Sequence, residues 1–363
     1  MKRVRWGIFG TGAVAASFAE DLRVAGRSDP LELAAVASRS REKAEAFART
    51  FGARRAYGGY EQLAADPGVD VVYVATPSSS HAAHAILALE RGKAVLCEKP
   101  FTVDAGQARQ VIDAARQAGV FCMEGMWMRF TPLVRELVRV VRGGSIGEPR
   151  MVNANLGFPF ERDPAHRLFD PAMGGGALLD LGVYALSFAF QFLGRPTGIE
   201  TQAVLGPTGV DEQVAVLLTF AGERQAIITA SLRTRTSNDA VILGEAGMIR
   251  VHEPLYCPEA ATIVRTHEHS GVSGGGSRSA MRSAIKRNAL LREAYARITR
   301  ARSERTIVQR RLGNGYAHEA IEVMRCLREG ATQSPVMPLD ESLAIVQTMD
   351  AIRARWSAPG SPG

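Results

Sequence analysis

The length and composition of the chain favour a protein of two domains. Its 363 residues are too many for one ordinary hydrophobic core, and a hydrophobic content of 46% can fill two. No run approaches the roughly 18 apolar residues of a membrane helix, and residues 1–6 lead into a strand without a secretory apolar region. We therefore expect a cytoplasmic protein with no membrane partner. The four cysteines lie far apart with no CxxC pair, which disfavours disulfides and a zinc knuckle.

The net charge of +7 comes from one segment. Residues 278–311 hold eleven Lys or Arg and two Glu, so the rest of the chain carries a small net negative charge. This composition favours helix but shows little apolar periodicity, which predicts a solvated basic helical insertion at about residues 273–311. No aromatic stacking platform or DNA-reading motif accompanies the charge, so we expect no nucleic-acid partner.

The first 122 residues alternate short β-branched runs with amphipathic stretches. This alternation predicts a doubly wound parallel sheet of the Rossmann type, so we assign residues 1–122 to a nucleotide-binding domain. Predicted strands span Val4–Phe9, Leu31–Ala37, Asp70–Ala75, Ala94–Cys97 and Val120–Met123, and predicted helices span Ala13–Ala25, Arg41–Phe51, His81–Arg91 and Ala105–Ala118.

Residues 123–355 show a different pattern, with strands that follow one another directly. This predicts a second, α+β domain with a large, mostly antiparallel open sheet. Predicted strands span Met151–Leu156, Ile199–Val204, Gln213–Phe220, Ala226–Leu232, Ala240–Leu243 and Met248–Val251, and predicted helices span Gly175–Phe192, Tyr316–Arg328 and Glu341–Arg355. The Ser270–Ser277 run is linker-like, and residues 356–363 should form a disordered tail.

A glycine-rich turn lies between the first predicted strand and the first predicted helix. Gly10, Gly12 and Ala15 form a GxGxxA motif there. Gly10 permits the tight turn, Gly12 lets the backbone approach a pyrophosphate, and Ala15 allows close helix packing. The helix N-terminus, with Thr11 and Ala13, offers free N–H groups to the anion. In this strand, turn and helix context the motif predicts dinucleotide binding.

The end of the second predicted strand indicates which dinucleotide binds. An NAD enzyme usually carries Asp or Glu there, but this chain has Ser38 and Arg39, with Lys43 one turn later. A hydroxyl and a guanidinium suit a 2′-phosphate, which an acidic side chain would repel, so we expect NADP(H). The alternative is a solvated surface arginine. Thr76 and Pro77 end the third strand in a turn where such folds bind ligands.

Glu98 and Lys99 follow the fourth predicted strand and precede Pro100. A charged pair at the end of a mostly buried strand is costly unless it contacts a ligand or each other. This Glu-Lys-Pro motif, the glycine turn and residues 174–184 (Gly-Gly-Gly-Ala-Leu-Leu-Asp-Leu-Gly-Val-Tyr) resemble the glucose-fructose oxidoreductase / inositol dehydrogenase (Gfo/Idh/MocA) family. Within it, the chain most resembles the dimeric dihydrodiol dehydrogenase and NADP-dependent D-xylose dehydrogenase branch. The resemblance covers about residues 1–265 and 312–355.

The resemblance implies a catalytic group. In the family the lysine of the Glu-Lys-Pro motif lies beside the nicotinamide and the substrate hydroxyl, and here it is Lys99. The residue closing an Asp-x-x-x-His/Tyr pattern is the acid/base, here Tyr184, with Asp180 one turn earlier on the same helix face. A tyrosine with an ordinary pKa of about 10 needs a nearby cation to accept a proton near neutral pH, and Lys99 is a candidate. The implied reaction is hydride transfer between the nicotinamide and a CH–OH or C=O group of a sugar or diol.

Many relatives carry histidine where this chain has Tyr184, which favours the dihydrodiol and aldose dehydrogenase branch.

Several further residues have two interpretations each. The resemblance implies cofactor contact for His81, Trp127 and Arg129, whereas the alternatives are a helix-start role for His81 and interdomain packing for the other two. Candidate substrate-binding residues, each with ordinary packing as the alternative, are Phe130, Phe158, His166, Arg167, Phe169 and Asp180.

The same motifs are compatible with two other functions, and the resemblance also implies an oligomer. A keto-sugar reductase acting on a phosphorylated or nucleotide-linked sugar would use the same acid/base, and a non-catalytic dinucleotide-binding sensor would keep the fold without turnover. The resemblance implies a homodimer or homotetramer through the C-terminal sheet, whose strands are more apolar than a water-facing sheet tolerates. We expect no metal site, because neither His81 with His84 nor the run 267–269 offers a convincing ligand set.

Overall fold

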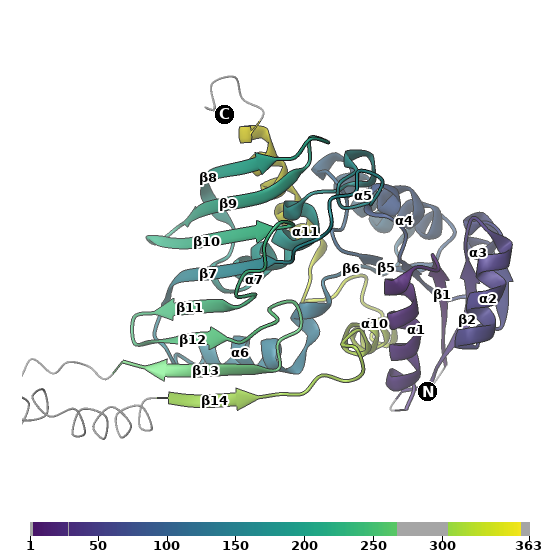
Figure 1. The fold of residues 1–363 in the computed structure, drawn as a ribbon. Helices are drawn as coiled ribbons and strands as arrows, with labels where there is room; N and C mark the ends of the chain where they lie inside the picture. Colours follow the sequence, from purple (N-terminus) through teal and green to yellow (C-terminus); the bar gives the residue numbers. More distant parts are fainter. Residues whose placement is uncertain (1–2, 28, 267–303, 357–363) are drawn as a thin grey trace, which may run out of the picture.

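Two sheets organise the chain (Figure 1). The computed structural model describes residues 3–27, 29–266 and 304–356. A six-stranded parallel sheet has the strand order β3-β2-β1-β4-β5-β6, and an eight-stranded sheet follows in the order β14-β13-β12-β11-β7-β10-β9-β8. The predicted fold class, a Rossmann-type parallel sheet joined to a large, mostly antiparallel sheet, is confirmed.

The parallel sheet consists of apolar strands with helices between them. Its elements are β1 (Val4–Phe9), α1 (Ala13–Ala25), β2 (Leu31–Ala37), α2 (Arg41–Phe51), β3 (Arg55–Tyr57), α3 (Tyr60–Ala64), β4 (Val71–Val74), η1 (Ser78–Ser80), α4 (His81–Glu90), β5 (Ala94–Glu98), α5 (Ala105–Ala118) and β6 (Cys122–Gly125). Strands β4 and β5 are buried throughout, as expected of strands covered on both faces. The short elements β3 and α3 are additional to the predicted ones, because three and five residues carry too little periodicity to be recognised.

The second sheet carries its helices between and after its strands. Its elements are η2 (Trp127–Phe130), α6 (Pro132–Arg142), β7 (Pro149–Gly157), η3 (Pro171–Met173), a π-helical turn η4 (Leu178–Gly182), α7 (Val183–Leu193), β8 (Pro196–Leu205), β9 (Asp211–Phe220), β10 (Arg224–Ser231), β11 (Ala240–Gly244), β12 (Gly247–Val251), β13 (Ala260–Arg265), β14 (Glu304–Val308), α10 (Ala317–Arg328) and α11 (Leu339–Trp356). The strands pair antiparallel except β7 with β10, which run parallel. Helix α7 packs against β7 and β10, and α11 packs against β8.

Two predictions in this part of the chain need correction. The helix expected at Gly175–Phe192 begins at Leu178, because Gly174 and Gly176 adopt positive φ angles that a helix excludes, and its first turn is π-helical. The basic segment expected to be helical over about 273–311 ends in strand β14, which pairs antiparallel with β13. Residues 273–303 of that segment, the Ser270–Ser277 run and residues 357–363 of the predicted tail lie outside the described residues, whereas Trp356, expected in the tail, ends α11.

One helical stretch has the length and apolar composition of a membrane span. It covers Pro171–Leu193, and 83% of its most apolar window is buried inside the protein. This burial is typical of the core helix of a folded domain, since α7 lies against the large sheet. All four cysteines are free and buried.

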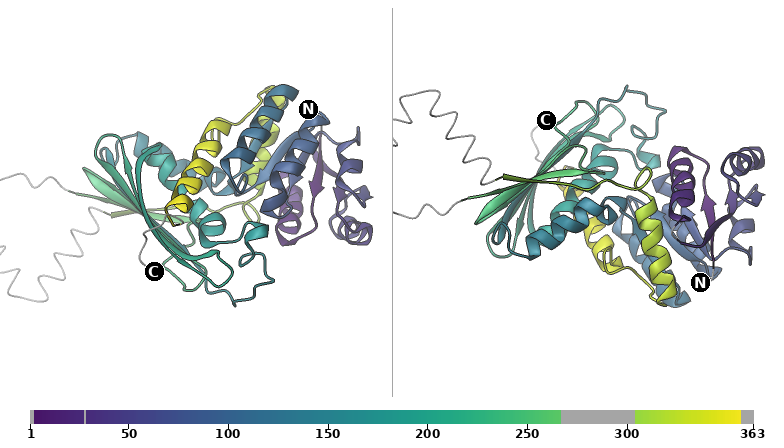
Figure 2. Two further views of the ribbon diagram at one scale, coloured as in Figure 1. Left: turned by 90° about the horizontal axis from the view of Figure 1, so that it is seen from above. Right: turned by 90° about the horizontal axis from the view of Figure 1, so that it is seen from below.

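The last two helices return to the N-terminal domain. Helix α10 packs beside α1, and α11 packs beside α5 (Figure 2). The buried carboxylate of Asp21 in α1 accepts hydrogen bonds from the backbone N–H groups of Asn314, Gly315 and Ala317, at 2.8, 2.9 and 3.0 Å. Asp21 therefore fixes the turn that leads into α10 against helix α1 of the N-terminal domain.

Replacing Asp21 tests this anchor. We expect Asp21→Ala to lower the free energy of unfolding by about 3 kcal/mol, because three N–H groups lose their shared hydrogen-bond acceptor. Urea unfolding followed by tryptophan fluorescence measures the change. Glu20→Ala on the same helix is the control; its exposed carboxylate accepts only from the Asn314 side chain, so the expected loss is about 0.5 kcal/mol or less. Equal losses in the two variants would contradict the assignment.

Candidate functional site

A pocket of about 420 Å³ lies at the carboxyl ends of β1, β2, β4 and β5. This is the edge at which doubly wound sheets bind ligands. The pocket extends from the glycine-rich turn to the start of the helix that carries Tyr184. It is lined by Gly10, Thr11, Gly12, Ala13, Val14, Ser38, Arg39, Lys43, Tyr60, Ala75, Thr76, Pro77, Ser78, His81, Glu98, Lys99, Pro100, Arg167, Gly174, Leu179 and Asp180.

The glycine-rich turn has the geometry of an anion cradle. Gly10 has a φ of +109°, and a Cβ atom there would lie 2.5 Å from the Ala75 carbonyl oxygen. A Cβ on Gly12 would meet no atom within 4 Å, so it would project into the open pocket. Helix α1 begins directly after Gly12 and has no side-chain cap, which leaves its first N–H groups for a ligand. The turn therefore fits a dinucleotide pyrophosphate.

The opposite wall of this end of the pocket carries hydroxyl and basic groups. Ser38, Arg39 and Lys43 all line it, at the end of β2 and the start of α2. Tyr60 lies beside them with its ring 5.0 Å from that of Phe9 and 4.3 Å from that of His84. An anionic group bound here would meet one guanidinium and one ammonium.

A cluster of charged groups closes the other end of the pocket. The Lys99 ammonium donates to the Asp180 backbone carbonyl at 2.7 Å and to its carboxylate at 3.4 Å, and the Arg167 guanidinium donates to the same carboxylate at 3.1 Å. Burial alone would raise the pKa of Asp180, but the two cations outweigh it and hold this pKa below its ordinary value. Asp180 is therefore ionised at neutral pH and keeps Lys99 at the pocket wall.

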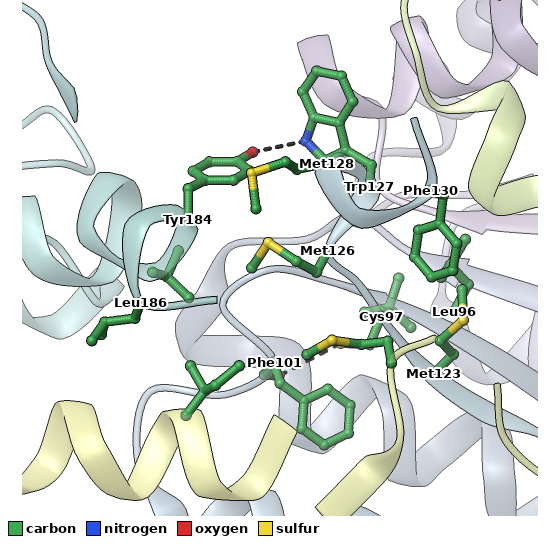
Figure 3. Close-up of a cluster of buried hydrophobic side chains, with 14 of the residues drawn as sticks. Leu96, Cys97, Phe101, Met123, Met126, Trp127, Met128, Phe130, Tyr184 and Leu186 are labelled. Carbon is green, nitrogen blue, oxygen red and sulfur yellow. Dashed lines mark hydrogen bonds between the residues drawn. The ribbon is translucent and has the colours of Figure 1, made fainter. Parts of the chain in front are cut away.

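Tyr184 lies behind this cluster and does not line the pocket. Its ring centroid is 4.6 Å from the Lys99 ammonium, and its hydroxyl accepts a hydrogen bond of 2.8 Å from the Trp127 indole N–H (Figure 3). Burial raises the pKa of Tyr184 well above its ordinary value, and the Trp127 N–H opposes part of this rise. The Lys99 charge therefore faces the ring of Tyr184, while Trp127 holds the hydroxyl oxygen.

Glu98 is a buried acid at the pocket wall. It accepts a hydrogen bond from the hydroxyl of Tyr73 and another, of 3.1 Å, from the Lys99 backbone N–H. Burial raises the pKa of Glu98 to about 7. The carboxyl of Glu319 in α10 is also buried, and burial raises its pKa well above the ordinary value. Glu98 therefore holds its proton to a higher pH than an exposed glutamate does, next to Lys99.

His81 begins helix α4 and also lines the pocket. Its Nδ1 lies 2.8 Å from the Pro100 carbonyl oxygen, and its Nε2 lies 2.9 Å from that of Thr76. Burial lowers the pKa of His81 to about 4, so the ring is neutral at pH 7 and only one of its two nitrogens carries the hydrogen to donate. His81 thus links the Thr76 turn to the cis Lys99–Pro100 peptide.

Several predicted site residues lie outside the pocket wall. Arg129 is 1% exposed and bonds to the Ser187 hydroxyl and carbonyl and to Glu341, so it ties η2 to α7 and α11. A further bond of 3.3 Å to the Val336 carbonyl also holds Arg129 away from the pocket wall, and its cofactor contact stays a prediction. The other predicted residues that do not line the pocket are Ala15, Trp127, Phe130, Phe158, His166 and Phe169; of these, Ala15, Phe130 and Phe169 are buried packing residues.

Other residues at the site escaped prediction. Tyr60, Ser78, Gly174 and Leu179 line the pocket. Around Trp127, the ring of Tyr316 stacks at 4.6 Å and that of Tyr256 lies at 5.9 Å. Ser78 directly follows Thr76 and Pro77, so the prediction of a ligand-binding turn there could have included it. Tyr256 and Tyr316 come from turns distant in the sequence, and no local pattern marks them.

No metal centre is formed within the described ranges. There, no three His, Cys, Asp or Glu side chains are grouped closely enough to hold an ion. His84 instead places its Nδ1 2.9 Å from the Thr76 hydroxyl. The run 267–269 lies outside these ranges.

Comparison with known proteins agrees with this geometry. Two family models match: "Oxidoreductase family, NAD-binding Rossmann fold" over residues 4–126, and "GFO/IDH/MocA C-terminal domain" over residues 134–250. The trans-1,2-dihydrobenzene-1,2-diol dehydrogenase of Macaca fascicularis is 34% identical over 352 residues, which cover 96% of each chain.

Two solved structures illustrate the likeness in three dimensions. A levoglucosan dehydrogenase in complex with NADH and levoglucosan has a TM-score of 0.81 at 19% identity and covers 97% of each chain. A 3-ketoreductase from Actinomadura kijaniata, in complex with NADP and TDP-benzene, has a TM-score of 0.75 at 25% identity and covers 97% of this chain and 98% of its own. The chain therefore belongs to the GFO/IDH/MocA family of NAD-binding oxidoreductases.

Proposed function

We propose that the protein is an NADP(H)-dependent oxidoreductase that interconverts a CH–OH and a C=O group of a sugar or diol. The observation that carries this proposal is the continuity of one pocket. It joins the Gly10–Gly12 cradle at one end to Lys99 and Asp180 at the other. If a dinucleotide binds with its pyrophosphate at the cradle and extends along the pocket, its nicotinamide would lie at the Lys99 end.

The residues present assign each part of the cofactor a partner. The free N–H groups at the start of α1 would hold the pyrophosphate, and Ser38, Arg39 and Lys43 would hold a 2′-phosphate. An acidic side chain, which NAD enzymes use for the ribose hydroxyls, is missing from this group of three. When bound, the nicotinamide supplies hydride transfer at its C4.

Proton transfer falls to Tyr184. In the oxidation direction the deprotonated Tyr184 oxygen takes the proton of the substrate alcohol and becomes the hydroxyl, and in the reduction direction the hydroxyl gives this proton back, since the same group serves both directions. The Trp127 N–H stabilises the deprotonated oxygen by donating to it, and the Lys99 ammonium over the ring adds a favourable charge. Asp180 holds Lys99 in that position.

Aromatic side chains beside Tyr184 support a ring-shaped substrate. Trp127, Tyr256 and Phe158 form successive ring contacts of 5.9 and 6.1 Å, and the ring of Tyr256 also lies 6.0 Å from that of Tyr184. Sugars and cyclic diols offer an apolar face to such rings and hydroxyls to a few polar groups. The names of the relatives, a dihydrodiol dehydrogenase and a levoglucosan dehydrogenase, agree with this substrate class.

We further propose that the open face of the large sheet pairs with a second copy. Leu217 in β9 and Ile227 in β10 are register partners, and both are exposed. Neighbouring apolar side chains on one sheet face favour a protein contact over water. In a homodimer the two copies would cover this face of each other, and a tetramer would contain two such contacts.

Gly12→Ala tests the cradle. The added methyl group meets no protein atom within 4 Å, so the melting temperature should stay unchanged, whereas the methyl group would occupy space needed by the pyrophosphate. We expect the Kd for NADP⁺, measured by calorimetric titration, to rise at least about tenfold. An unchanged Kd would place the dinucleotide elsewhere.

Arg39→Ala tests the cofactor preference. The loss of a charge-assisted contact to a 2′-phosphate should weaken NADP⁺ binding by about tenfold to a hundredfold, while NAD⁺ binding changes by less than about threefold. Arg41→Ala is the control, because Arg41 is exposed, pairs with Glu45 and does not line the pocket. Equal weakening of NADP⁺ and NAD⁺ by Arg39→Ala would contradict the proposed NADP preference.

Tyr184→Phe tests the chemistry. We expect turnover of the best substrate from a panel of aldoses, trans-diols and keto-sugars to fall by about 10²–10⁴-fold with cofactor binding retained. Absorbance at 340 nm measures turnover, and Tyr57→Phe, whose hydroxyl bonds to Asp66 away from the pocket, is the matched control. Full turnover by Tyr184→Phe would exclude it as acid/base. Tight NADP⁺ binding by the wild type without turnover on the panel, extended to phosphorylated and nucleotide-linked sugars, would favour a sensor.

A further inference from the structure

We propose that Asp211 is a positioning residue that fixes the π-helical turn η4, and through it the placement of Lys99 beside Asp180 and Tyr184. The inference rests on the proposed function, because it concerns the same catalytic group. Asp211 does not line the pocket and has no part in the mechanism described above. It lies at the start of β9, in the sheet of the second domain.

The backbone of η4 is itself part of the lysine site. The Val183 N–H bonds to the Leu178 carbonyl, five residues earlier, which defines the wider π turn. Within this turn the Asp180 carbonyl accepts from the Lys99 ammonium at 2.7 Å, a shorter contact than the 3.4 Å to the Asp180 carboxylate. Because a backbone atom provides the closer contact, the position of Lys99 depends on the path of the turn as well as on the Asp180 side chain.

Asp211 holds the first residue of that turn. Its carboxylate accepts a hydrogen bond of 2.6 Å from the Leu178 backbone N–H, one of the groups that a helix start leaves without a helical partner. The Asp211 side chain is buried, and so is the turn residue it contacts. A short hydrogen bond to a buried carboxylate oxygen, shielded from water, fixes the start of η4 relative to β9.

The three glycines before the turn let this contact form. Gly176 has a φ of +119°, and a Cβ atom there would lie 2.1 Å from Asp211 Oδ1. A Cβ on Gly175 would lie 2.6 Å from the Leu168 carbonyl oxygen, and one on Gly174 would lie 2.7 Å from Ser78 Oγ. Each glycine therefore lets a different segment approach the backbone closely: β9 at Gly176, the loop with Arg167 and Leu168 at Gly175, and the N-terminal domain at Gly174. The glycine run is thus the place where these three segments meet.

The junction also contacts the cofactor side of the pocket directly. The Ser78 hydroxyl donates to the Met173 carbonyl at 2.9 Å, just before the glycine run, and Ser78 lines the pocket. The segment is thus held from both domains, by Ser78 just before the glycine run and by Asp211 at the start of η4. Of these two, Asp211 is the one whose removal leaves the pocket wall intact.

Two variants of Asp211 and one neighbour form the test. Asp211→Ala removes the acceptor, whereas Asp211→Asn keeps an oxygen able to accept from Leu178 N–H. Glu212→Ala is the matched control: Glu212 is adjacent and also buried, and within the described residues its carboxylate pairs with Arg162 and Arg233 rather than with η4. Each variant is assayed for kcat, KM and the pH profile of kcat, with folding checked by circular dichroism and NADP⁺ binding by calorimetry.

We expect Asp211→Ala to lower kcat by about tenfold to a hundredfold, with KM and the NADP⁺ Kd within about threefold of wild type. The apparent pKa of the basic group in its pH profile should rise, because the ammonium is no longer held over Tyr184. Asp211→Asn should restore kcat to within about threefold. Equal effects of Asp211→Ala and Glu212→Ala, or an unchanged pH profile, would overturn the proposal.

A second readout does not depend on turnover. The rate at which an amine-reactive reagent labels Lys99, followed by peptide mass spectrometry, should rise in Asp211→Ala and stay at the wild-type rate in Asp211→Asn and Glu212→Ala. An unchanged labelling rate in a folded Asp211→Ala would overturn the inference. If the wild-type protein showed no turnover on any substrate, the proposed function would fail while the labelling experiment still decided the role of Asp211.

Discussion

The contact between the Lys99 ammonium and Asp180 joins the two domains at the point where chemistry is proposed. Lys99 follows β5 of the parallel sheet, and Asp180 belongs to the π turn that precedes α7. Removing a charge from water is costly, so the ammonium needs the backbone carbonyl, the carboxylate and the ring of Tyr184 around it. The relative placement of the two domains is therefore a condition for the site to exist.

Further contacts keep that placement constant. Asp21 of the first domain binds the turn before α10, and within the second domain Arg129 binds α7 and α11. That turn carries Tyr316, which stacks on Trp127, and Trp127 in turn holds the hydroxyl of Tyr184. A side chain on the first cofactor-domain helix is thus connected through packed contacts to the proposed acid/base, which agrees with a rigid arrangement of the reacting groups.

The acids in this region differ in charge because their surroundings differ. Asp180 has two cations beside it and a lowered pKa, whereas Glu98 and Glu319 are buried and have raised ones. The pocket end near Lys99 therefore carries one ionised carboxylate and one group, Glu98, that titrates near neutral pH. Such separation of pKa values within one site is typical of catalytic pockets.

The sequence by itself determined the parallel sheet, the glycine turn with Ser38 and Arg39, and the motif that contains Asp180 and Tyr184, because each depends on local periodicity, on short turn geometry or on a motif of a few residues. It did not determine the hydrogen-bond partners of Arg129, because Ser187 and Glu341 lie far along the chain. It also did not determine the contacts that the rings of Tyr256 and Tyr316 make with Trp127. Only the tertiary structure decided which face of Tyr184 meets Lys99 and that Asp211 holds the π turn. Those contacts arise where segments more than 30 residues apart pack together, and no local pattern encodes such packing.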